Sequence, residues 1–297
     1  MGMNAVATVT FFHHAGLMAA VEDTLLVFDY WQGENGEISG ENGLCEADFE
    51  GYKQIIVFVS NDDEDHFDPV VLGWDAKKYP ITYVFADDMR NHPALHDMRD
   101  CVYLGEGDNV WVGDDTKIDA YASTHKGVSF YVTVHGLHIF HAGTLNMWHW
   151  RDESTLREIV QAEESFYAAV APITRLPMDI AMFPVDPRMG GMYDAGANHF
   201  VMAVKPRLFI PMHWQNRSEV AVSFARQGHT DYTEVLALTR PRQRAEVTFG
   251  DNTIRIHVFT LKEMQQEKEK NRSVQDVKLD TYEKDDPFTD TDLPVTM

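Results

Sequence analysis

Short apolar or alternating runs recur along this chain and predict a strand-rich protein. The runs are short and rich in Val, Ile, Phe and Tyr, a combination that favours strands over buried helices. The predicted strands cover residues 5–12, 24–30, 54–60, 81–86, 129–135, 137–143, 179–185, 207–213 and 253–260. Gly136 lies between two of these runs, where a tight hairpin turn would join them.

Helical spacing of apolar residues begins only in the second half of the chain, at residues 152–170, 195–205 and 217–227. Mostly β structure followed by strand–helix alternation is typical of two packed sheets flanked by helices. Beyond residue 262 large apolar residues become rare and charges of both signs common. We therefore predict one domain over residues 1–261 and a charged C-terminal extension over 262–297, for which a solvated appendage is favoured over a lid or docking segment.

Charge narrows the classes of partner. The chain has 25 Lys and Arg against 47 Asp and Glu, a formal net charge of −22. Such a surface repels phosphate backbones unless basic residues are concentrated locally, and no basic run occurs, so a small-molecule substrate is expected and a nucleic acid is not. Self-association into a homo-oligomer stays open.

The apolar segments and the cysteines bear on location. The opening residues have no basic or apolar leader pattern, and no apolar run is long enough to span a bilayer. We expect a cytoplasmic protein without membrane contact. Cys45 and Cys101 do not have the paired spacing of a thiolate zinc site, and we expect them to be reduced and buried.

Candidate chemistry begins directly after the run at 54–60. There the sequence reads Asn-Asp-Asp-Glu-Asp-His over residues 61–66, so a buried strand meets a loop of oxygen and imidazole donors. These donors can converge on a cation without cysteine. An acidic turn after a strand is as often only a solvated loop, but His125 and His213 also adjoin apolar strands, which favours a metal site.

In their order, these segments resemble the metallo-β-lactamase superfamily. Its H-x-H-x-D-H signature falls on Asn61, Asp63, Asp65 and His66, its next His on His125, its bridging Asp on Thr144 and its last His on His213. The ascorbate-lactonase-like branch is matched more closely, through motifs at residues 14–17, 29–30, 141–150, 183–188 and 211–213. The resemblance covers roughly residues 8–260. It implies an α/β (α+β) fold, the four-layer αββα sandwich.

The resemblance implies two metal-ligand sets, of which one is altered. The first falls on Asn61, Asp63 and His125, and the second on Asp65, His66 and His213. Two of the first three positions have changed residue type, and Thr144 has no carboxylate to bridge two ions. We therefore expect one divalent ion rather than two, with zinc, manganese or iron all suited to the second set.

The expected activity is hydrolysis of a small ester, lactone or phosphoester by a metal-activated water. A catalytically silent protein that keeps the fold for binding or assembly is the alternative, supported by the changes in the first set. Arg188 would pair with an anionic group of the substrate or, equally, form a structural salt bridge. The predicted site comprises Asp63, Asp65 and His125 as catalytic residues, Asp63, Asp65, His66, His125 and His213 as metal ligands, and His14, Asn146, Asp186 and Arg188 as substrate-binding residues.

Overall fold

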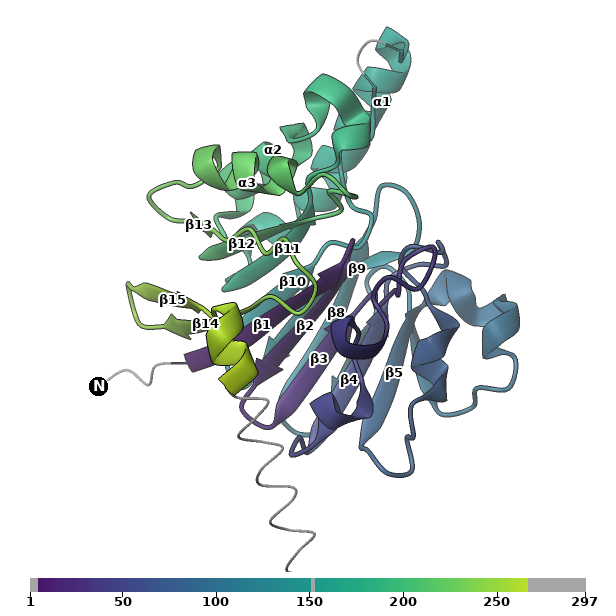
Figure 1. The fold of residues 1–297 in the computed structure, drawn as a ribbon. Coiled ribbons are helices and arrows are strands. Elements are labelled where there is room, and N and C mark those ends of the chain that lie inside the picture. The colour runs from purple at the N-terminus through teal and green to yellow at the C-terminus, as the bar shows by residue number, and fades with distance from the viewer. Residues whose placement is uncertain (1–4, 151–152, 267–297) are drawn as a thin grey trace, which may run out of the picture. The chain divides into compact units, whose positions relative to one another are not determined.

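The computed structural model describes residues 5–150 and 153–266, which form two mixed β-sheets with helices (Figure 1). Within these residues the first sheet has eight strands. In spatial order they are β15 (Ile254–Val258), β14 (Arg244–Phe249), β1 (Ala5–His13), β2 (Gly16–Val21), β3 (Thr24–Phe28), β4 (Gln54–Val59), β5 (Ile81–Ala86) and β6 (Cys101–Leu104).

The second sheet has seven strands in the described part of the chain. They follow the order β13 (Glu234–Val235), β12 (Leu208–Met212), β11 (Ile180–Pro184), β10 (Leu137–His141), β9 (Val128–Val134), β8 (Thr116–Ala122) and β7 (Asn109–Val112). Helices α2 (Ala195–Val204) and α3 (Ser218–Gln227) contact β11 and β12, and α1 (Leu156–Val170) lies beside them in Figure 1. Short 3₁₀ helices occupy Gly40–Asn42, Glu46–Phe49, Pro69–Gly73, Asp87–Asn91, Pro93–Leu95, Ile173–Arg175 and Pro187–Met192.

Aromatic side chains fill the space between the two sheets. The rings of Phe58 on β4 and Phe130 on β9 lie 5.1 Å apart, and Phe28 on β3 stacks on His141 of β10 at 4.9 Å. Each pair joins a strand of one sheet to a strand of the other, so the sheets share one core. The predicted αββα sandwich is confirmed.

Parallel pairing in the middle of each sheet positions the site. Strands β3 to β6 pair in parallel, as do β10 to β13. Strands β11 and β12 are buried along their whole length, as expected for parallel strands covered on both faces. The register pairs Phe28 with Phe58 and Pro184 with Met212, so the loops after these strands start side by side at the carboxyl ends. Ligand sites of parallel sheets form at this edge.

Most predicted elements are present. The three predicted helices correspond to α1, α2 and α3. Helix α1 begins after Thr155, whose hydroxyl accepts the Glu158 N–H as an N-cap. Residue 152, where this helix was predicted to begin, lies outside the described residues. Gly136 forms the predicted hairpin, with a φ of 80° and Val134 paired to Leu137. Strands β2, β6, β7, β8, β13 and β14 were not predicted. In β2, Gly16, Ala19 and Ala20 weaken the apolar pattern. The expected burial of Cys45 is wrong: both cysteines are free, and Cys45 is exposed.

A second compact unit begins at Val258. Its described part is helical over residues 261–266, and Thr260 and Glu263 cap the start reciprocally, with a Thr260 N–H to Glu263 Oε2 distance of 2.7 Å. The rest of the predicted extension lies outside the described residues. Over residues 5–150 and 153–266, no helix has both the length and the apolar character needed to cross a bilayer.

Candidate metal centre

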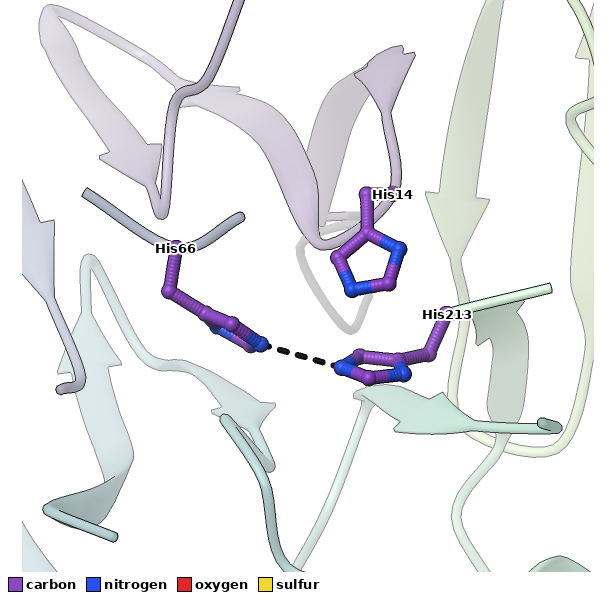
Figure 2. Close-up of side chains that lie close together, drawn as sticks. All are labelled: His14, His66 and His213. Atoms are coloured by element: carbon purple, nitrogen blue, oxygen red, sulfur yellow. Dashed lines mark hydrogen bonds between the residues drawn. The ribbon is translucent and has the colours of Figure 1, made fainter. Parts of the chain in front are cut away.

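Three buried histidines converge at the carboxyl edge of the sheets (Figure 2). His14 lies in the turn between β1 and β2, His66 in the loop after β4, and His213 directly after β12. Each offers a ring nitrogen, and these atoms lie within 4.8 Å of one another. The His213 N–H also donates to the carbonyl of His14 at 3.0 Å, which ties the two segments together.

A buried carboxylate orients each of two of these rings. Asp29, directly after β3, lies 2.7 Å from Nδ1 of His66, and Asp186, in the loop after β11, lies 2.7 Å from Nδ1 of His213. Asp29 is itself fixed by Ser60, whose N–H and hydroxyl donate to it at 2.7 and 2.6 Å. A carboxylate accepts only from a protonated Nδ1, so both rings present Nε2 to the centre. Such carboxylate–histidine pairs are a regular feature of metal sites.

The two oriented Nε2 atoms face each other at a distance of 3.0 Å. With both Nδ1 atoms protonated, two neutral rings would point lone pairs at one another, which is repulsive. A proton or a metal cation at Nε2 removes this repulsion. Two imidazole nitrogens 3.0 Å apart are close enough for both to bind one metal ion.

The third ring and one carboxylate complete the donor set. Nε2 of His14 is buried and has no hydrogen bond of acceptable geometry, although Oδ2 of Asp65 lies 3.1 Å away. Oδ1 of Asp65 also lies 4.0 Å from Nε2 of His66. An orphaned buried imidazole nitrogen beside a carboxylate is costly unless another group engages it. Three imidazoles and one carboxylate suit zinc, iron or manganese.

Burial and the neighbouring charges separate the pKa values of the three rings. Burial lowers the pKa of His14 to about 3, and the nearby His213 adds to this effect. Burial also lowers the pKa of His213, and outweighs Asp186. For His66, burial is outweighed by the charge and hydrogen bond of Asp29, so its pKa is raised. The directions differ, so His66 binds a proton more readily than His14 or His213, and a proton on it would relieve the contact with His213.

Strained backbone surrounds the centre. His14, Asp29 and His213 have φ angles of 51°, 41° and 67°, in the left-handed region that residues other than glycine rarely adopt. Each such residue costs of order 1–3 kcal/mol and persists only where the surrounding structure enforces it. Because three such residues surround one donor cluster, the contacts that position the donors outweigh the cost of the backbone strain.

Arg188 and Trp148 lie beside His213. The Arg188 guanidinium donates to Asp186 through Nε and Nη2, the latter at 2.6 Å, and Nη2 lies 3.2 Å from Nδ1 of His213. The structural salt bridge considered for Arg188 is thus formed, yet half of its side chain stays exposed, at 51%. The Trp148 ring lies 5.8 Å from His213, and its Nε1–H donates to the Thr144 carbonyl. Together they give the centre a cationic and an aromatic neighbour.

The residues predicted for the first metal set are engaged with one another and with Lys126. In the described part of the chain, the three-histidine group includes neither Asp63 nor His125. The Asn61 side chain accepts the Asp63 N–H at 2.9 Å and donates to Ser60, so it stabilises the loop. Asp63 lies 2.6 Å from the ammonium of Lys126, and His125, whose side chain is 56% exposed, lies 3.6 Å from Asp63.

Other predicted residues support the centre indirectly. Asp186 lies behind His213 and orients it. The Asn146 side chain is engaged by the Met147 N–H and the Met189 sulfur. Asp29 and Lys126 had no predicted role, and His14 was predicted to bind substrate. The opening motif that contains His14 and Asp29 was the available signal.

No protein-family model matches the chain, and neither does any curated protein sequence. Solved structures do. A novel metallo hydrolase from the hyperthermophilic archaeon Ignicoccus hospitalis superposes with a TM-score of 0.61 at 14% identity, over 82% of this chain and 100% of that one. The metallo-β-lactamase fold protein YhfI from Bacillus subtilis gives 0.52 at 10% identity, over 82% and 99%.

A third structure carries a different printed activity. CmlA, a diiron β-hydroxylase from Streptomyces venezuelae, superposes with a TM-score of 0.55 at 12% identity, over 82% of this chain and 54% of that one. These identities establish the fold alone, because one fold hosts many reactions. The chain has the metallo-β-lactamase fold, and its function has to be argued from its own site.

Proposed function

We propose that this protein is a hydrolase that depends on one divalent metal ion held by His14, Asp65, His66 and His213. The observation that carries the proposal is the 3.0 Å approach of the His66 and His213 Nε2 atoms, each ring locked by a buried carboxylate. Such an arrangement is repulsive without a cation and favourable with one.

The donor set defines the chemistry. A bound divalent metal supplies Lewis acidity, which lowers the pKa of a coordinated water toward neutrality and polarises a carbonyl or phosphoryl oxygen. Asp29 and Asp186 keep His66 and His213 in the tautomer that ligates. Among the predicted catalytic residues, His125 suits the role of proton acceptor better than Asp63, because Lys126 already holds the Asp63 carboxylate.

We assign the substrate to small esters, lactones or phosphoesters. The exposed half of the Arg188 side chain suits an anionic group of such a molecule, since a guanidinium binds carboxylates and phosphates in a bidentate manner. The Trp148 ring beside His213 suits an apolar portion.

Elemental analysis of the protein purified without an affinity tag tests the metal. We expect about one equivalent of a transition metal, lost in His66→Ala. The matched control is His138→Ala, because His138 forms a similar 3.1 Å contact with Asp179 away from the centre. Absence of metal after incubation with zinc, manganese and iron, or full retention in His66→Ala, would refute the centre.

Hydrolysis of a panel of esters, lactones and phosphoesters tests the reaction. We expect turnover of at least one class that a chelator abolishes and the metal restores. A protein that binds its metal and hydrolyses none of the panel would instead support the catalytically silent alternative.

A further inference from the structure

Lys126 forms an ion-pair cluster with two acidic residues of the loop that follows β4. Its ammonium lies 2.6 Å from Oδ1 of Asp63 and 2.9 Å from Oδ1 of Asp62. Nε2 of His125 lies 3.6 Å from the other oxygen of Asp63. Two carboxylates and one imidazole thus lie around a single positive charge, and with Lys126 in place their ligand atoms do not form a group compact enough to hold a metal ion in the described part of the chain.

Hydrogen bonds and close packing hold the backbone at and after Lys126. The Thr144 hydroxyl donates to the Lys126 carbonyl at 2.9 Å and accepts its N–H at 3.3 Å. Gly127 follows with a φ of 62°, and a Cβ there would lie 1.7 Å from the Ser60 carbonyl oxygen, so only glycine fits. The Gly127 N–H donates to Asp88 at 3.0 Å. Lys126 is therefore held by contacts on both sides.

This cluster adjoins the three-histidine centre. Asp63 accepts the backbone N–H of His66 through its carbonyl at 2.9 Å, and its side-chain charge acts on both His66 and Arg188. Lys126 thus contacts, through Asp62 and Asp63, the same loop that bears Asp65 and His66. A positive charge at this position offsets the acidic loop and is available to a substrate, since 43% of the side chain is exposed.

We propose that Lys126 is a built-in cation that takes the place of a second metal ion beside the centre, and so limits the centre to one ion. The proposal rests on the proposed function in that it assumes an ion at His66 and His213. The sequence changes agree with it: Asp63 pairs with the ammonium, Asn61 caps the Asp63 N–H, and Thr144 holds the Lys126 backbone.

Metal stoichiometry after saturation with zinc or manganese, followed by gel filtration and elemental analysis, tests the proposal. We expect one equivalent in the wild type and two in Lys126→Met, because the freed Asp62, Asp63 and His125 then bind a divalent ion. Adding Asp63→Asn to Lys126→Met should return the count to one. Lys126→Arg, which keeps the charge, should also bind one.

Lys117→Met is the matched control, because Lys117 pairs with Asp119 at 2.6 Å on β8 and its loss should leave the count unchanged. Lys126→Gln serves if Lys126→Met does not fold. Two equivalents in the wild type, or an unchanged count in folded Lys126→Met and Lys126→Gln, would overturn the proposal. A wild type without metal would refute the proposed centre. If Lys126→Met nevertheless gains one equivalent of metal, and loses it when Asp63→Asn is added, the built-in cation would still be supported.

Discussion

Asp29→Asn separates the orienting role of the buried carboxylate from its volume. Oδ1 of Asp29 accepts the Ser60 N–H at 2.7 Å, while Oδ2 accepts the Ser60 hydroxyl at 2.6 Å and the His66 Nδ1–H at 2.7 Å. An asparagine that keeps its oxygen toward the Ser60 N–H turns its NH₂ group toward His66. His66 must then accept at Nδ1, which moves its proton to Nε2, the atom that faces the metal position.

The opposite orientation of the asparagine is no better. It directs the NH₂ group at the Ser60 N–H, and a buried donor left without an acceptor costs about 1–3 kcal/mol. The first orientation removes the ligating tautomer of His66, and the second keeps it only at this cost, so both weaken metal binding. Removing such an outer carboxylate typically weakens metal binding about 10- to 100-fold, which corresponds to about 1.4–2.7 kcal/mol.

Competition for zinc between the protein and a chromophoric chelator measures this loss as a change in Kd. Asp179→Asn is the control, because Asp179 contacts Nδ1 of His138 at 3.1 Å and belongs to no donor cluster in the described part of the chain. Its Kd should equal that of the wild type. An unchanged Kd in folded Asp29→Asn would refute the idea that this carboxylate sets the His66 tautomer.

Three further predictions concern stability. In the presence of a chelator, the free energy of unfolding of the wild type should fall as the pH drops from 6.5 toward about 3, because His14 binds a proton in the unfolded chain but not in the folded protein. Denaturant titrations should show a smaller loss between pH 7 and pH 5 in His14→Asn. An equal loss in the variant and the wild type would contradict this prediction. Gly127→Ala should destabilise the protein by about 2–5 kcal/mol through backbone strain and overlap with Ser60. Gly136→Ala should show the backbone strain alone, because no described atom lies within 4 Å of a Cβ at that position. Similar losses in the two variants would contradict the close contact between Gly127 and Ser60. Thr144→Val removes both bonds to the Lys126 backbone and should cost about 1–3 kcal/mol in thermal or chemical unfolding, with no loss contradicting the buried contact.

The sequence alone determined the layers and the location of the donors. Continuous apolar runs such as residues 179–185 and 207–213 favour strands covered on both faces, and these became β11 and β12. Because such strands align in parallel, the polar residues that follow them meet at one edge. The family resemblance predicted His66 and His213 as metal ligands and Asp186 as a substrate-binding residue, whereas the structure places Asp186 against Nδ1 of His213.

Only the tertiary structure decided which donors meet. His14 is brought to His213 by a turn with left-handed backbone and by a hydrogen bond across the sheets, neither of which a local pattern encodes. Lys126 and Asp63 are 63 positions apart, and their pairing depends on how two loops pack at Gly127. Sequence periodicity reports which face of an element is buried, whereas contacts between loop side chains depend on strand register and backbone strain that arise only when the sheets assemble.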